Sequence, residues 1–311
     1  MEWSANNSMR QIRRWLKRVV GAVAGRIAVI LIRAIRHADR ISVARFTGGL
    51  LRRIGPWLPE QRLACANLMA AFPDKPEREI EKILDGSWDN LGRVAAEFAF
   101  LDRLHVQRPG DPPTADVIYD EVDRRRFEEM RAAPKPTAFF AAHLGNWELP
   151  GLVATRAGLE SAVLYRAPGL REVADAVLEI RKGCMGTLIA SGFDAPFRLS
   201  GALARGCNVG MLVDQYDIRG VEVNFFGRIC KVSPLIAQLA RNTECNVRGI
   251  RIIRLPDGNH FRGEISEPLD LPRDAENRVD ITRTMQAVTS VIEAWVREYP
   301  EHWLWQHRRW R

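Results

Sequence analysis

The sequence predicts an α/β protein with a mostly parallel central sheet flanked by helices, preceded by an N-terminal helical segment that associates with membranes. From about residue 137, short apolar runs alternate with helix-length segments, the pattern of a parallel sheet covered on both faces. Residues 56–130 are predicted as a helical lead-in. With 311 residues the chain can bury a sizeable core, so residues 56–311 are predicted as one domain and residues 1–55 as a separate basic segment.

The N-terminal segment stands out by its charge. It holds twelve Lys/Arg against two acidic residues, Glu2 and Asp39, and so contains the whole of the net charge of +8. A nucleic-acid-binding protein carries such charge on its folded domain, so we predict no nucleic-acid partner. A basic segment beside apolar residues favours an anionic membrane surface as partner.

The same segment contains an apolar run, Val19–Ile32, interrupted by Arg26. This run is shorter than the roughly 20 residues that cross a bilayer, and no small-residue cleavage pattern follows it. The basic residues that mostly recur at helical spacing are Arg10, Arg13, Arg14, Lys17, Arg18, Arg26, Arg33, Arg36 and Arg40. We therefore predict an interfacial amphipathic helix. The alternatives are a helix packed on the protein with a solvated basic face, or a tilted crossing with Arg26 buried against protein.

The body of the chain shows helix and strand periodicity in turn. In the lead-in, apolar residues recur at helical spacing on both sides of a break at residues 73–76. The predicted strands are Thr137–Ala142, Ser161–Tyr165, Thr187–Ala190, Val209–Val213, Val221–Phe225, Val247–Leu255 and His260–Ile265. The predicted helices are 146–157, 170–182, 195–205, 233–243 and 278–298.

His143 and Glu148 form the main candidate site. They follow an apolar strand, where ligands bind in open α/β sheets. On one helix they would lie about 140° apart, so the chain must turn between them; Gly145 permits the turn and Asn146 is a suitable N-cap. Glu148 is then expected to hold one ring nitrogen of His143 and leave the other as a base, with backbone N–H groups near Gly145 and Asn146 for an oxyanion. The alternative is a loop histidine and an acid at a helix N-terminus.

Four segments carry a family resemblance. The run from His143 to Glu148 resembles the His-x4-Asp/Glu (HX4E) motif of the bacterial lipid A biosynthesis acyltransferases, the late lauroyl/myristoyl transferases. The other matching segments, in chain order, are Tyr165-Arg166, Asp214-Gln215 with Asn224-Phe225-Phe226-Gly227, and the terminal Pro300-Glu301-His302-Trp303-Leu304-Trp305-Gln306-His307-Arg308-Arg309-Trp310.

The resemblance implies a glycerolipid-acyltransferase-like fold and transfer of an acyl chain from an acyl-carrier-protein thioester to a hydroxyl of a lipid A precursor. It places the protein at the cytoplasmic face of the inner membrane, peripheral or with a single N-terminal anchor, with acyl carrier protein and a glycolipid as partners and no cofactor beyond the thioester. In the family the His and Glu of the motif are catalytic, and a further Asp and Arg are needed. The Asp matches Asp214, and the Arg matches Arg181 or else Arg166. Arg181 is followed by Lys-Gly-Cys instead of a more basic run.

The remaining site residues have less specific expectations. Arg166 and Arg181 are candidate contacts for phosphates, because Arg forks match phosphate geometry; a surface salt bridge is the alternative for each. Asp214 is expected to orient a sugar hydroxyl, pair with an Arg or cap a turn, and Gln215 and Asn146 to contact substrate. Phe225 and Phe226 either line an acyl groove or belong to the core, and the Trp-rich C-terminus is either an interface belt or docked on the core.

Other enzyme classes lack their motifs here. There is no Gly-x-Ser-x-Gly elbow, no P-loop and no second histidine at zinc-ligand spacing. The five cysteines are scattered without a CxxC pair, which favours a reducing compartment and argues against a metal site. The alternative functions are acylation of another glycolipid, such as mannosylated phosphatidylinositol, and non-catalytic binding to a membrane surface.

Overall fold

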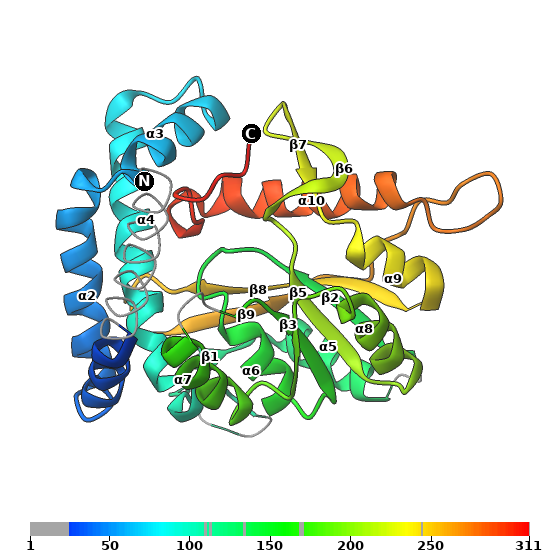
Figure 1. The fold of residues 1–311 in the computed structure, drawn as a ribbon, viewed down its shortest axis with the longest axis horizontal. Coiled ribbons are helices and arrows are strands. Elements are labelled where there is room, and N and C mark those ends of the chain that lie inside the picture. Colours follow the sequence, from blue (N-terminus) through cyan, green and yellow to red (C-terminus); the bar gives the residue numbers. More distant parts are fainter. Residues whose placement is uncertain are drawn as a thin grey trace, which may run out of the picture.

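The structure of the protein is a computed structural model that describes residues 25–310, apart from residues 109–110, 112–113, 133–134, 168–170 and 244. Helices and strands alternate along most of the chain after residue 136 (Figure 1). The helices are α2 (Arg40–Ile54), α3 (Glu60–Ala71), α4 (Glu77–Glu97), α5 (Glu121–Ala132), α6 (Leu149–Arg156), α7 (Arg171–Lys182), α8 (Ala195–Ala204), α9 (Leu235–Thr243) and α10 (Ile281–Glu298), with 3-10 turns at Gly55–Trp57, Phe98–Arg103 and Pro300–His302.

The central sheet has seven strands in the order β1-β9-β8-β2-β5-β3-β4. Every neighbouring pair is parallel except β8 and β9, which confirms the predicted mostly parallel sheet flanked by helices. The strands of this sheet are β1 (Val117–Ile118), β2 (Thr137–Ala141), β3 (Ser161–Tyr165), β4 (Thr187–Ala190), β5 (Asn208–Leu212), β8 (Asn246–Arg254) and β9 (Phe261–Ile265).

A separate two-stranded sheet was not predicted. The strand expected at residues 221–225 is the end of β6 (Tyr216–Phe225), which pairs antiparallel with β7 (Arg228–Val232). Phe226 and Gly227 form the two-residue connection and both have positive φ, 54° and 71°, as short hairpin turns require. Periodicity missed β7 because its exposed and buried residues alternate over only five positions.

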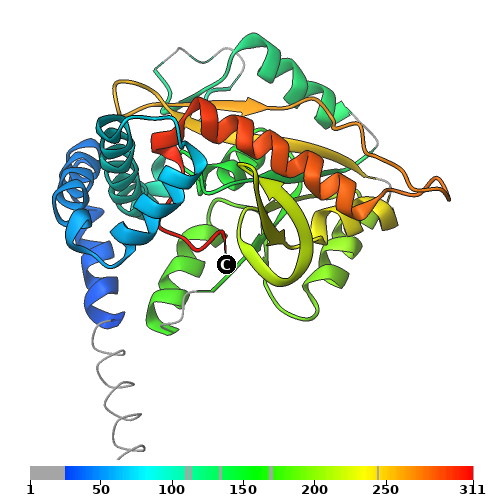
Figure 2. The same cartoon turned by 90° about the horizontal axis from the view of Figure 1, so that it is seen from above.

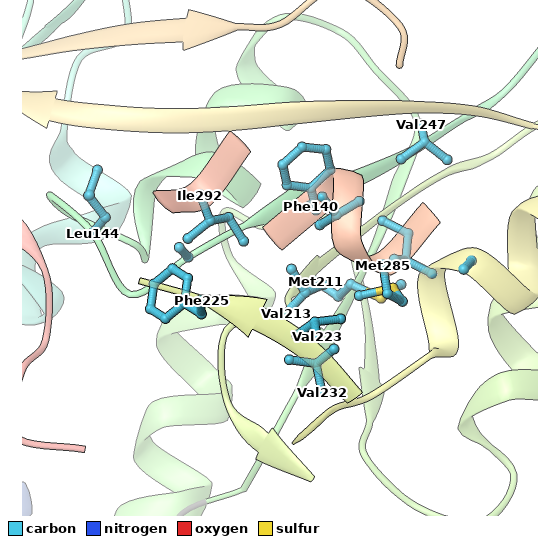
Figure 3. Close-up of a cluster of buried hydrophobic side chains, with 14 of the residues drawn as sticks. Phe140, Leu144, Met211, Val213, Val223, Phe225, Val232, Val247, Met285 and Ile292 are labelled. Carbon is cyan, nitrogen blue, oxygen red and sulfur yellow. The ribbon is translucent and has the colours of Figure 1, made fainter. Parts of the chain in front are cut away.

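Alternate residues of β2 pack on opposite faces of the sheet. Ala138 and Phe140 lie in a cluster with side chains of α8, α9 and α10, whereas Phe139 and Ala141 lie in a second cluster with α5 and α6. The β6–β7 hairpin covers the first cluster beside α10, and Figure 3 shows its side chains facing those of the sheet and of α10. A strand of five buried residues is therefore explained by helices on both faces.

The N-terminal helices pack against the body at the end of the sheet that carries His143 (Figure 1). Gly48 of α2 and Gly92 of α4 let these helices approach closely, since a Cβ on Gly92 would meet the backbone of Thr47 and Gly48. Arg36 and Arg40, expected on the basic face of the N-terminal segment, instead bind Asp102 and Asp116 of the body.

The predicted membrane segment is described only in part. Residues 1–24, with five of its twelve Lys/Arg, lie outside the described residues. The described helix at residues 25–35 exposes Ile27, Ile30 and Leu31. Among the residues that the structure describes, no helix has both the length and the apolar character that crossing a membrane requires. The division at residue 55 stays a prediction.

Candidate active site

His143 and Asp214 meet because their strands are neighbours. Strands β2 and β5 are parallel, and Ala141 pairs with Leu212. Each candidate residue lies two positions beyond this last pair, so both follow the carboxyl ends of adjacent strands. The Nδ1 atom of His143 is 2.8 Å from Oδ1 of Asp214. The sheet therefore builds a buried histidine–carboxylate pair.

The hydrogen bonds of this pair define the state of the ring. Asp214 is fully buried, and its Oδ2 accepts a hydrogen bond from the His143 backbone N–H at 2.9 Å. Since an ionised carboxylate only accepts, Nδ1 carries the ring proton. Nε2 then keeps a lone pair, which accepts a hydrogen bond from the side-chain amide of the exposed Gln215 at 3.4 Å. The unprotonated nitrogen thus lies beside an exposed side chain.

Burial and charge act in opposite directions on the pKa of His143. Burial lowers it, but the charge and hydrogen bond of Asp214, with a smaller effect of Glu148, outweigh burial and raise the pKa above 6.5. For Asp214, burial opposes ionisation, but the neighbouring imidazole and hydrogen bonds hold the pKa of the carboxyl well below its ordinary value. The pair is thus an ionised carboxylate that stabilises an imidazolium.

Glu148 does not orient His143, contrary to the sequence-based expectation. Its carboxylate binds Arg181 of α7, with Oε1 and Oε2 at 2.7 and 2.8 Å from Nη2 and Oε2 at 3.1 Å from Nε. The Arg181 guanidinium also lies over the rings of Phe98 and Tyr165, at 5.4 and 5.9 Å from their centroids. Glu148 is the acid nearest to His143 along the chain, but strand order brings Asp214 to the ring, and α7 brings a cation to Glu148.

Gly145 and Asn146 form the predicted turn, but their backbone N–H groups are not available for an oxyanion. Gly145 has φ +62°, and a Cβ there would overlap the carbonyl oxygen of Ile252. The N–H of Gly145 donates to His302 O at 3.0 Å, and that of Asn146 to Ile252 O at 3.1 Å. Helix α6 begins at Leu149, so Glu148 occupies the N-cap position that was predicted for Asn146. The Asn146 side chain accepts from the Glu148 N–H at 3.2 Å.

A buried ion pair that the sequence analysis missed supports this turn. Glu97 at the end of α4 and Arg254 at the end of β8 are paired at 2.5 and 2.8 Å. Glu97 also accepts from the Asn146 side chain at 2.8 Å, and Asn90 donates to the Gly145 carbonyl at 3.0 Å. Asn146 therefore binds within the protein, away from the predicted role of contacting substrate. The one sequence signal was an acid in the buried stripe of an amphipathic helix.

The C-terminal segment, defined here as residues 300–310, is docked on the core beside the site. Trp303, Trp305 and Trp310 are buried, which decides between the two alternatives left by the sequence. The Leu304 N–H donates to the His143 carbonyl at 3.0 Å. Figures 1 and 2 show this segment ending between the N-terminal helices and the β6–β7 hairpin.

The remaining candidates lie at the edges of the site. Arg166 is exposed just after β3 and makes no ion pair with the residues that the structure describes. Phe225 is fully buried, against Trp303 and Trp310 at centroid distances of 5.5 Å each, and Phe226 is buried beside Phe72. Both phenylalanines belong to the core and do not line a groove.

Fold and site together define a class: an α/β protein in which a carboxylate orients a histidine, the pairing that enzymes use to activate a nucleophile. The model of the family described as bacterial lipid A biosynthesis acyltransferase matches residues 8–311. The chain therefore belongs to that family and is an acyltransferase of the lipid A pathway. No curated protein matches the chain.

Proposed function

We propose that the protein transfers a fatty acyl group from an acyl-carrier-protein thioester to a hydroxyl of a lipid A precursor, with His143 as general base and Asp214 as the group that orients it. The observation that carries the proposal is the buried pair, with Nδ1 of His143 bonded to Asp214 at 2.8 Å. Family membership supports the lipid acceptor. The thioester donor rests on the resemblance, and a thioester is activated enough to need no covalent enzyme intermediate.

In the proposed reaction, Nε2 of His143 first accepts a proton and later donates it. Nε2 of His143 takes the proton of the acceptor hydroxyl as its oxygen attacks the thioester carbonyl, and Asp214 stabilises the imidazolium. The tetrahedral intermediate collapses with breakage of the carbon–sulfur bond. The departing thiolate takes the proton from Nε2, which leaves an ester, a free thiol and a neutral His143.

Glu148 and Arg181 take a different part in the proposal. Arg181 is held by two of its nitrogens on Glu148 and is half-buried between two aromatic rings. We propose it as a fixed anion contact for phosphates of the acceptor or of the donor's phosphopantetheine arm, with the exposed Arg166 as a second contact. Glu148 keeps the guanidinium in place and adds negative charge that favours the imidazolium.

The proposed location is the cytoplasmic face of the inner membrane. The charge of the N-terminal segment supports it, because each Lys or Arg near an anionic surface contributes about 1 kcal/mol. The exposed Ile27, Ile30 and Leu31 supply apolar contacts in the described part of that segment. Acyl carrier protein, the membrane surface and the glycolipid are thus the proposed partners.

The variant His143→Ala tests the catalytic part of the proposal. Acyl transfer from purified acyl-carrier-protein thioester to lipid A precursor should fall by about 10²- to 10⁴-fold, the range for loss of a general base. The matched control is His260→Ala, because His260 pairs with Asp257 at the surface. Unchanged turnover in His143→Ala would refute the assignment of His143 as the general base.

The acceptor is tested in the host. Deletion of the gene should give lipid A that lacks one acyl chain, seen by mass spectrometry of extracted lipids. Unchanged lipid A, with loss of an acyl chain from another glycolipid such as mannosylated phosphatidylinositol, would refute this acceptor and keep the chemistry.

A further inference from the structure

Two side chains of the C-terminal segment bind Asp214 at atoms other than Oδ1, the oxygen that contacts the imidazole. The indole N–H of Trp303 donates to Oδ2 of Asp214 at 2.9 Å. Nη1 of Arg309 donates to the Asp214 carbonyl oxygen at 2.9 Å. Trp303 is 1% exposed and Arg309 is 0% exposed, so neither contact competes with water. The segment therefore holds both the side chain and the backbone of this acid.

We infer that Trp303 and Arg309 are positioning residues of the proposed acyl-transfer reaction: they fix the orientation and charge of the Asp214 carboxylate, and through it the basicity of His143. This inference rests on the proposed function, and it assigns a task within that reaction to the C-terminal segment.

Three donors fix the orientation of the Asp214 carboxylate. Oδ1 of Asp214 binds Nδ1 of His143, while Oδ2 accepts from both the His143 backbone N–H and the Trp303 indole. A carboxylate with donors on both oxygens cannot rotate without losing a bond. Trp303 is itself fixed, because Ser87 Oγ donates to its carbonyl at 2.9 Å and the Trp305 ring lies edge-on at 4.6 Å.

Arg309 contributes a buried positive charge beside Asp214. A buried guanidinium usually needs a carboxylate partner because burial of an unpaired charge is costly. Arg309 forms no ion pair with a described side chain, and its Nε and Nη2 have no hydrogen-bond partner there. Burial lowers the pKa of Arg309, whereas Cys230 and, to a smaller extent, Asp214 raise it. The ring of Phe225, whose centroid is 4.8 Å from the guanidinium, offsets part of the cost of burying the charge. Because the cation lies beside Asp214, it favours the ionised carboxylate.

Loss of the Trp303 indole donor is expected to raise the pKa of His143. The charged or titratable groups that face the pair are Glu148 with its partner Arg181, His307 and Arg309. Loss of the indole N–H leaves Oδ2 bound to the His143 backbone, so the carboxylate stays but its charge is less dispersed. The imidazolium is then stabilised more strongly, and the pKa of His143 rises further.

The test compares three substitutions of one kind. Trp303→Phe removes the donor to Asp214, whereas Trp305→Phe and Trp310→Phe remove indole donors to the backbone carbonyls of Pro300 and Phe225. For Trp303→Phe we expect about tenfold lower kcat and an acidic limb of kcat/KM moved up by several tenths of a pH unit, because a hydrogen bond to a charged group is lost. The two controls should keep the wild-type limb.

Partial misfolding of a variant would not change the pH at which its acidic limb lies. An inactive fraction scales the rate at every pH equally and leaves the position of the limb unchanged. Arg309→Gln provides a second variant: removal of a nearby cation should also move the limb upward, by up to about one unit, and Arg309→Lys should restore most of it. The pKa of His143 can be followed without turnover by NMR of isotopically labelled histidine.

The outcomes separate this inference from the proposed function. If wild type does not transfer acyl groups, the proposed function fails. If wild type is active but the limb and the NMR pKa of Trp303→Phe coincide with those of the Trp305→Phe and Trp310→Phe controls, the inference is overturned and the proposed function stands.

Discussion

Replacement of Asp214 by Asn is the sharpest test of the site, because it keeps the shape and removes the charge. Two donors, the His143 backbone N–H and the Trp303 indole, converge on Oδ2 at 2.9 Å each. The amide oxygen of Asn must take that place, which turns its NH2 group toward Nδ1 of His143. Nδ1 must then accept, the ring proton moves to Nε2, and the base is in the wrong tautomer.

The magnitude follows from this change of tautomer. In a well-studied serine protease the equivalent Asp to Asn change costs about 10⁴ in kcat, and we expect a loss of 10²- to 10⁴-fold here. The pKa shifts in a known direction as well. In wild type, burial lowers the pKa of His143 and Asp214 raises it, so activity falls as pH drops through a pKa above 6.5. Without the charge, burial dominates and the remaining activity should persist to lower pH.

The assay is kcat/KM for acyl transfer between pH 5 and 9, with the tautomer read from ¹⁵N NMR of labelled histidine. Asp257→Asn is the matched control, since Asp257 forms an exposed pair with His260. More than a tenth of wild-type activity in Asp214→Asn, or an acidic limb that does not move, would refute the assignment of Asp214 as the orienting group.

Three further predictions concern the support of the site. Gly145→Ala should destabilise the fold in urea unfolding by about 1–3 kcal/mol more than Gly206→Ala, the usual cost of overpacking. Both glycines have positive φ, but of the two only Gly206 has open space for a Cβ. Equal losses would contradict the close approach at Gly145. Glu97→Gln leaves the buried Arg254 charge without its partner and should cost about 3–5 kcal/mol, so a loss below 1 kcal/mol would show the pair to be dispensable. Burial lowers the pKa of His307 to about 4, so unfolding takes up a proton below pH 6.5 and stability falls as the pH drops from there toward 4. His307→Gln should therefore reduce the difference in the free energy of unfolding between pH 7 and pH 5 by up to about 2 kcal/mol. An unchanged difference would argue against a neutral buried ring.

The sequence predicted most of the sheet because its signal is local. Ser161–Tyr165 and Thr187–Ala190 have the predicted bounds, and the other predicted strands of the sheet differ by a residue at one or both ends. Strand order is not local: β2 and β5 are neighbours although β3 and β4 lie between them in the chain. The partner of His143 depends on that order, and this is why sequence reasoning found both His143 and Asp214 but did not pair them.

The buried support of the site was beyond prediction for a related reason. Glu97 and Arg254 are separated by 157 residues, and neither belongs to a recognisable motif. In the sequence each looks like an ordinary surface charge, because only the fold brings the end of α4 to the end of β8. The C-terminal motif was recognised as a sequence pattern, but its contact with Asp214 joins residues 89 positions apart. The sequence identifies the residues of the motif, but their contact partners depend on tertiary packing.

The spacing of His143 and Glu148 has its own explanation once Asp214 is the orienting acid. Two carboxylates on one imidazole would repel each other in a buried site. The structure avoids this: Asp214 contacts the ring, while Arg181 neutralises Glu148, whose charge still reaches His143. The intervening residues let the chain leave β2, turn at Gly145 and begin α6 at Leu149. The His-x4-Glu spacing therefore encodes a strand–turn–helix connection that places the histidine beside an acid paired with Arg181, and not a direct contact between the two.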